Sequence, residues 1–256
     1  MVSHVNPTRS RRALAHVAKR AFAWAGLEVS RRRPVDAPVL SRFDQRRSKL
    51  MQDNQVDLVL DVGASRGYYA LTLRAAGYRG SIVSFEPLPG SFAALEQHSQ
   101  GDPSWTLERV ALGNADGEAI IHVAGNAVSS SLLPMAARHL SAAPEAGYVA
   151  DERVRVARLD SVASTYVAET TRAYLKMDVQ GYEDQVLLGA TETLSRVVFI
   201  ESELSLCHLY GGQMLCADMI KLLAELDFEL VAVEDAFVEA ATGRTLQIDG
   251  IFARRV

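Results

Sequence analysis

The stretch over residues 57–69 constrains the fold of this chain more than any other. An apolar run there ends in Asp61, and a glycine turn then leads into a helix. A second apolar run over residues 81–85 ends in Glu86. The turn residues are Gly63, Ala64 and Gly67. This order of strand, glycine turn, helix, strand and acid is typical of the first unit of an open α/β sheet that binds a nucleotide-type cofactor.

Apolar runs of strand length alternate with helical segments from residue 56 onward. Strands are predicted over 56–61, 81–86, 105–111, 118–123, 154–159, 173–178, 196–201, 228–233 and 248–254. Helices are predicted over 67–76, 91–100, 182–189 and 214–226. Residues 124–152 predict a long loop with a helical piece near 134–140, and Asp160 is expected to cap the next helix. The alternation predicts an α/β fold with a mostly parallel sheet and helices on both faces.

Charge divides the chain into two parts. Residues 1–50 contain 12 Lys or Arg and three acids, whereas residues 51–256 have a net charge of −13. We therefore expect a basic helical arm with its linker over 1–50 and a cofactor-binding domain over 51–256. The acidic domain disfavours nucleic acid as a partner. An amphipathic helix over 11–29 could pack on the domain or on a partner subunit of a homodimer, or lie on an anionic membrane surface.

Composition indicates a cytoplasmic protein. The chain has no run of 18 apolar residues, and Arg31, Arg32 and Arg33 stand where a signal peptide would have its cleavage site. The two cysteines are too few for a disulfide framework and are interpreted as free thiols. The basic arm leaves open a contact with the inner face of the membrane.

The glycine turn helps to identify the cofactor. A dinucleotide site favours a glycine at the middle position of this turn, where the chain has Ser65, whose side chain hinders the approach of a pyrophosphate. S-adenosylmethionine has no phosphate but has a sulfonium, an ammonium group and a ribose diol. Glu86 would accept hydrogen bonds from the diol, and Asp61 would orient the methionine end through backbone or water. A nicotinamide-dependent oxidoreductase remains the alternative.

Five motifs, taken in order, resemble the FkbM family of S-adenosylmethionine-dependent methyltransferases. They are DVGASRGYY at 61–69, FEP at 85–87, VALG at 110–113, LKMDVQGYE at 175–183 and IESELS at 200–205. The resemblance implies a class I, Rossmann-like sheet of seven strands with the last antiparallel, and methyl transfer to hydroxyl groups of sugars, glycolipids or natural products. Gln180 departs from the family pattern, because many relatives have Glu there.

The motifs also imply which residues bind the cofactor. These are Asp61, Gly63, Ala64, Gly67, Glu86, Pro87 and Ala111. The acceptor is expected to be a small molecule, a sugar or a glycolipid, and not a nucleic acid, although a nucleic-acid methyltransferase using the basic arm stays as an alternative.

Methyl transfer to a hydroxyl needs a base or a metal, because a sugar hydroxyl is a weak acid. Asp178, at the end of a strand, is predicted to be the base or a metal ligand, with His139 and His208 as alternative bases. Asp178 together with Glu201 and Glu203 would offer three oxygen ligands suited to Mg²⁺. Lys176 lies two residues before Asp178 and is expected to pair with an acid on the same strand face.

Overall fold

The computed structural model describes residues 40–255, which belong to one compact unit that begins at Leu40. The amphipathic helix predicted over 11–29 lies outside the described residues. Helix α2 (Arg42–Asp53) spans the boundary that is predicted after residue 50. This helix buries Phe43 and Met51 in the same apolar core as the sheet.

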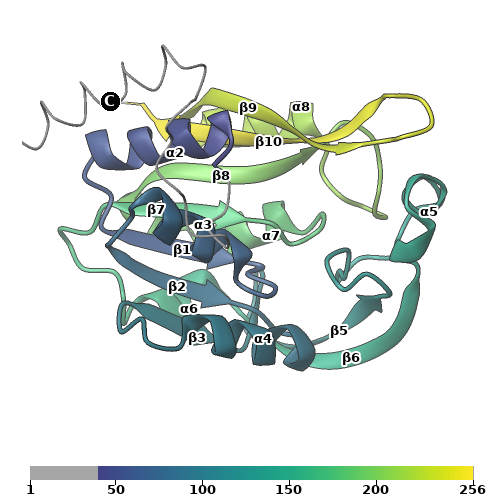
Figure 1. The fold of residues 1–256 in the computed structure, drawn as a ribbon, viewed down its shortest axis with the longest axis horizontal. Coiled ribbons are helices and arrows are strands. Elements are labelled where there is room, and N and C mark those ends of the chain that lie inside the picture. Colours follow the sequence, from purple (N-terminus) through teal and green to yellow (C-terminus); the bar gives the residue numbers. More distant parts are fainter. Residues whose placement is uncertain (1–39, 256) are drawn as a thin grey trace, which may run out of the picture. The chain divides into compact units, whose positions relative to one another are not determined.

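A seven-stranded sheet forms the centre of the unit (Figure 1). In spatial order its strands are β3 (Trp105–Glu108), β2 (Ser81–Phe85), β1 (Leu58–Val62), β7 (Ala173–Met177), β8 (Val197–Ser205), β10 (Thr245–Arg254) and β9 (Phe228–Val238). The first five are parallel, whereas β10 is antiparallel to both neighbours. The order reverses direction at β1 and β7, so their carboxyl ends form the switch point where open sheets bind ligands. The predicted fold class is confirmed.

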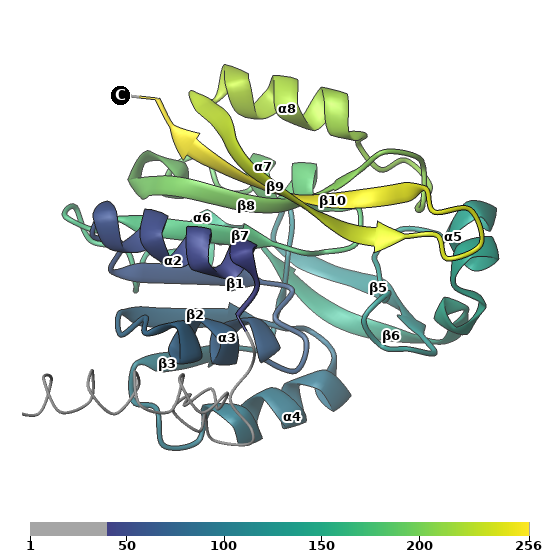
Figure 2. The ribbon, with the colours of Figure 1, turned by 45° about the horizontal axis from the view of Figure 1, so that its top comes forward.

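Helices cover both faces of the sheet (Figure 2). One face holds α2, α3 (Tyr68–Ala76) and α4 (Pro89–Ser99), which contribute Phe43, Leu73 and Leu95 to one core. The other face holds α6 (Leu159–Ala163), α7 (Glu183–Leu188) and α8 (Cys216–Glu225), packed on a second core. The parallel strands are therefore buried from both sides, which explains their nearly continuous apolar sequence.

A second sheet stands beside the carboxyl ends of the strands and differs from the prediction. It has the order β4 (Ala111–Leu112), β6 (Tyr148–Ala157) and β5 (Gly117–Ala124). The strand predicted over 105–111 is two strands, because β4 pairs with β6 and leaves the main sheet. Strand β6 begins in the predicted loop, where polar, exposed residues conceal the strand pattern. Between β5 and β6 lie α5 (Ala137–Ala142) and the short 3₁₀ helix Pro144–Ala146.

Asp160 does not cap the helix that contains it. Its carboxylate accepts hydrogen bonds from the backbone N–H groups of Glu192 and Thr193, at the start of the 3₁₀ helix Thr193–Arg196. The sequence pattern identified a capping residue correctly but assigned it to the wrong helix, because the true partner is 32 positions away.

Helix α2 is held to the sheet by a buried ion pair. The Arg47 guanidinium donates to both carboxylate oxygens of Glu201 on β8, with Nε–Oε2 and Nη2–Oε1 distances of 2.6 Å. The hydroxyls of Tyr69 and Tyr174 donate to Oε2 of the same carboxylate, at 3.0 and 2.5 Å. Arg47 also donates to Asp44 at 2.6 Å. The two hydrogen bonds between Arg47 and Glu201 therefore join α2 to β8.

Arg47→Met is expected to lower the free energy of unfolding by about 3–5 kcal/mol, because it leaves Glu201 charged and buried without its cation. Urea denaturation measures the loss. The matched control is Lys49→Met on the same helix, where the exposed pair with Asp53 contributes less than about 1 kcal/mol. Equal effects of the two substitutions would contradict the buried-pair interpretation.

Candidate active site

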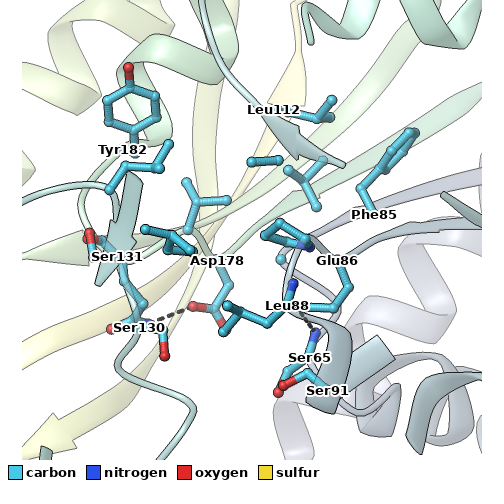
Figure 3. A pocket seen from close by; sticks show the side chains of 18 of the residues that line it. Ser65, Phe85, Glu86, Leu88, Ser91, Leu112, Ser130, Ser131, Asp178 and Tyr182 are labelled. Atoms are coloured by element: carbon cyan, nitrogen blue, oxygen red, sulfur yellow. Dashed lines mark hydrogen bonds between the residues drawn. The ribbon is translucent and has the colours of Figure 1, made fainter. Parts of the chain in front are cut away.

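A cavity opens at the carboxyl ends of β1, β2 and β7, between the main sheet and the second sheet (Figure 3). The empty space in it, including open solvent at the mouth, is about 720 Å³. Among the lining residues, Glu86 and Asp178 are the only ones with an ionisable carboxyl or basic group. The apolar wall comprises Phe85, Leu88, Val110, Leu112, Ile121 and Leu132.

The glycine turn is shaped by the neighbouring strand as much as by a ligand. Gly63 has a φ of +76°, and a Cβ there would overlap the backbone carbonyl of Asp178. The Asp178 N–H donates to the Val62 carbonyl at 3.0 Å, which draws the ends of β1 and β7 together. Ser65 also has a positive φ, of +48°, and this turns its backbone N–H toward Glu86.

Glu86 is a buried carboxyl with unused hydrogen-bonding capacity. Its two oxygens accept from the backbone N–H groups of Ser65, at 2.9 Å, and Leu88, at 2.8 Å, and the residue is 5% exposed. Burial raises the pKa of Glu86 to about 7, although both N–H donors act to lower it. A carboxylate accepts about four hydrogen bonds, so Glu86 can still bind a pair of ligand hydroxyls.

Asp61 lies fully buried beneath the turn and does not line the cavity. Its Oδ2 accepts from the Ser84 hydroxyl at 2.9 Å, while Oδ1 has no hydrogen-bond partner within residues 40–255. The Lys176 ammonium lies 3.7 Å from that oxygen and 3.4 Å from Oδ2 of Asp178. The expected pairing of Lys176 is therefore confirmed. Burial lowers the pKa of Lys176, but the charges of Asp178 and Asp61 outweigh it, so the ammonium stays charged.

The residues predicted to bind the cofactor separate into two groups. Those that line the cavity are Gly63, Glu86, Pro87 and Ala111. Those that lie behind it are Asp61, Ala64 and Gly67. Ala64 packs in the apolar core, and a Cβ at Gly67 would press on Leu95 and Trp105. This second group shapes the turn from within and does not contact the space of the cavity.

Asp178 is the carboxylate that faces the cavity on the β7 side, and 34% of its side chain is exposed. Its Oδ1 accepts from Nε2 of Gln180 at 2.6 Å, and Oδ2 faces Lys176. Two donors thus fix the carboxylate plane, while its remaining acceptor sites are free for a ligand.

The predicted magnesium ligands are not gathered. Glu201 is bound by Arg47 away from the cavity, and Glu203 accepts from the side-chain amides of Gln180, at 3.0 Å, and Gln247, at 3.1 Å. Within the described chain, no three His, Cys, Asp or Glu side chains are placed to hold a metal ion. These acids were predicted as ligands because they lie at strand ends. No local sign in the sequence indicated that Arg47 on α2 would bind Glu201 instead.

Neither predicted histidine lines the cavity. His139 on α5 is buried against Tyr210 and Phe237, with ring centroids 5.1 and 5.6 Å apart. Burial lowers the pKa of His139, and its Nδ1 has no hydrogen-bond partner within residues 40–255. His208 is exposed on the segment after β8. Their placement gives neither ring direct access to a ligand in the cavity.

Two features of the site escaped sequence reasoning. Lys176 was paired with an acid but given no role, and Gln180 was treated only as a departure from the family pattern. The wall segment at Ser130, Ser131 and Leu132 comes from the connection between β5 and β6. The alternation of Lys176 and Asp178 on one strand face was the available signal for the first of them.

Comparison with known proteins decides the family. The model of the methyltransferase FkbM domain matches residues 61–230. The chain belongs to the FkbM methyltransferase family. As a member of this family it is an S-adenosylmethionine-dependent methyltransferase, which confirms the cofactor predicted from the turn. The chain is 29% identical to the 2-O-methyltransferase NoeI of Sinorhizobium fredii (strain NBRC 101917 / NGR234) over 181 residues, covering 68% of this chain and 73% of NoeI.

The solved structures that this chain matches include an rRNA methylase and a fibrillarin. An rRNA methylase from Streptococcus thermophilus is 11% identical with a TM-score of 0.46, covering 86% of this chain and all of that one. Aeropyrum pernix fibrillarin in complex with S-adenosyl-L-methionine is 13% identical with a TM-score of 0.44, covering 77% of this chain and 66% of that one.

The cavity of this FkbM member suits S-adenosylmethionine. Glu86 offers a buried carboxylate with spare acceptor sites for the ribose diol, and the apolar wall offers a surface for an adenine ring. Gly63 and Ser65 bring backbone to the cavity without a bulky side chain between. Oδ1 of Asp61, buried and without a hydrogen-bond partner within residues 40–255, adds negative charge behind the turn, partly offset by Lys176.

Proposed function

We propose that the protein is an O-methyltransferase that methylates a hydroxyl group of a sugar, a glycolipid or a related natural product. The observation that carries the proposal is the position of Asp178. It is the one carboxylate besides Glu86 in the cavity lining of the described chain, and it stands at the end of a different strand. Similarity to NoeI, which is described as a 2-O-methyltransferase, supports transfer to oxygen.

The two carboxylates of the cavity have separate roles in the proposed reaction. Bound S-adenosylmethionine supplies an electrophilic methyl group on its sulfonium. Glu86 would hold the cofactor by its diol, and Asp178 would accept the proton of the acceptor hydroxyl as that oxygen is methylated. Leu88, Leu112 and Leu132 would exclude water from the reacting groups.

The charge of the domain supports a small acceptor. Residues 40–255 have a net charge of −10, which repels the phosphates of RNA and DNA. No helix within residues 40–255 is long and apolar enough to cross a membrane. Contact of the basic arm with a membrane surface, a homodimer and the role of the arm stay predictions.

The proposal is tested by incubating the full chain with S-adenosylmethionine labelled in its methyl group and a panel of free sugars, glycolipids and polyketide-type alcohols. We expect label in a methyl ether, identified by mass spectrometry, with rRNA and tRNA as parallel substrates. Label confined to nucleic acid or to an amine would refute the proposed acceptor class while leaving the cofactor assignment intact.

A further inference from the structure

Gln180 connects the candidate base with three other segments, two through its side chain and one through its backbone carbonyl. It lies in the turn after β7, at a φ of +56°. Its Nε2 donates to Oδ1 of Asp178 at 2.6 Å and to Oε2 of Glu203 on β8 at 3.0 Å. Its Oε1 accepts from the Tyr210 hydroxyl at 2.6 Å, and its backbone carbonyl accepts from the Ser131 hydroxyl at 2.8 Å. One residue thus joins two strand ends to the wall of the cavity.

The amide can take only one orientation. Both partners of Nε2 are carboxyl groups, which accept hydrogen bonds, and the partner of Oε1 is the Tyr210 hydroxyl, whose oxygen lies nearer to Gln180, at 2.6 Å, than to the Ser129 carbonyl, at 3.1 Å. Rotating the amide by half a turn would place its oxygen against Asp178 and Glu203, so acceptors would face acceptors. Tyr210, which is itself buried, therefore fixes the direction from which Gln180 donates to Asp178.

Glu203 is the second carboxyl group that the amide of Gln180 contacts. Burial, followed by the charges of Asp178 and Asp249, raises the pKa of Glu203 well above its usual value. The amide stands between Glu203 and Asp178 and separates the two carboxyl groups. The ionisable groups around it are Lys176 on β7, Asp178, Glu183 on α7, Glu203 on β8, Asp249 on β10 and Tyr210. Within this group, Lys176 is the single cation.

We propose that Gln180 is a positioning residue for methyl transfer: its fixed amide holds the Asp178 carboxylate in the direction of the acceptor. The inference rests on the proposed function, in which Asp178 serves the acceptor hydroxyl. Lys176 holds the second oxygen at 3.4 Å, so Gln180 at 2.6 Å makes the shorter contact. Without it, Asp178 would be free to rotate about χ1 and χ2 into the open cavity.

A matched pair of substitutions tests the role. Gln180→Met and Gln247→Met each remove one amide that donates to Glu203, but only the first removes the donor to Asp178. With the hydroxyl compound that the wild type methylates, we expect kcat to fall about 10- to 100-fold in Gln180→Met. Gln247→Met should keep kcat within about threefold, because it does not contact Asp178. The KM for S-adenosylmethionine should stay within about threefold in both variants, since Glu86 is untouched.

Gln180→Glu supplies a signature that a structural role would not produce. The carboxylate form replaces a donor by an acceptor beside Asp178, whereas the protonated form can donate again. The kcat of this variant relative to wild type at the same pH should therefore rise as the pH falls. The corresponding ratio for Gln180→Met should not change with pH, because methionine has no proton to gain.

A crystal structure of each methionine variant tests the inference without any acceptor. We expect the Asp178 carboxylate to leave its position in Gln180→Met and to keep it in Gln247→Met. The inference is overturned if Asp178 stays in place in Gln180→Met, if that variant keeps the wild-type kcat, or if both variants lose activity equally. A wild-type enzyme that methylates no hydroxyl refutes the proposed function instead, and the crystal structures still decide the role of Gln180. Should Gln180→Met not fold, Tyr210→Phe removes the hydroxyl that orients the same amide and is examined in the same way.

Discussion

Replacing Glu86 by glutamine is expected to weaken the binding of S-adenosylhomocysteine about 10- to 100-fold. The glutamine has nearly the same shape, but its amide nitrogen must face either the Ser65 N–H or the Leu88 N–H. One buried donor then loses its acceptor, and the ribose diol loses a charged partner. Isothermal titration calorimetry measures the affinity, and an unchanged dissociation constant would remove Glu86 from the cofactor site.

The same residue predicts how affinity depends on pH. In the folded, ligand-free protein, burial raises the pKa of Glu86 from 4.5 to about 7. The folded protein therefore binds the proton more tightly than the unfolded chain does. Ionised Glu86 therefore lowers stability, increasingly as the pH rises from about 4.5 to 7. Because the diol needs the ionised form, affinity for S-adenosylhomocysteine should rise with pH up to about 7 and then level off.

Two variants separate Glu86 from other groups that titrate in this range. In Glu86→Gln the rise with pH should vanish. In Asp249→Asn the rise with pH should persist. Burial raises the pKa of Asp249 to about 7 as well, but this residue does not line the cavity. Loss of the pH dependence in Asp249→Asn would assign it to the acidic cluster instead of to Glu86.

Asp178→Asn is expected to lower kcat about 10²- to 10⁴-fold while the affinity for S-adenosylhomocysteine stays within about threefold. Asparagine cannot accept the acceptor's proton, and its amide nitrogen would face a donor, either Lys176 or Gln180. Steady-state kinetics with the methylated hydroxyl compound, together with calorimetry, separates rate from binding.

Histidine variants provide the comparison for Asp178. His139→Asn and His208→Asn should keep kcat within about threefold once folding is verified, because neither ring lines the cavity. Wild-type rates in Asp178→Asn, or a loss of activity confined to one of the histidine variants, would move the base to another residue.

The fold could be predicted from sequence because its signals are local. The apolar run before Asp61, the glycine turn and the run before Glu86 follow one another within one β-α-β unit, and the structure reproduces them nearly to the residue. Only the second half of strand β6 was predicted, because its first six residues, at 148–153, are mostly exposed and include three consecutive charged residues. The second sheet therefore could not be drawn from hydrophobic periodicity.

The site was only partly predictable, because it depends on partners far apart in the chain. Glu201 ends up at Arg47, 154 positions away, and this contact removes it from any metal site. His139 follows a run of serines that does reach the cavity, but α5 turns its ring toward Tyr210 and Phe237. Glu86 and Asp178 were placed correctly because both directly follow strands whose carboxyl ends meet at the switch point.

Helix α2 determines how far the chain can be shortened from its N-terminal side without loss of stability. The recognisable family segment starts at residue 61, yet the cation that neutralises Glu201 comes from Arg47. A shortened chain cut at the start of the family match would keep the carboxylate and the two tyrosine hydroxyls, but it would lose their guanidinium. Such a chain is expected to fold poorly, because it loses both the cation that neutralises Glu201 and residues 58–60 of the central strand β1, although every residue of the cavity is still present.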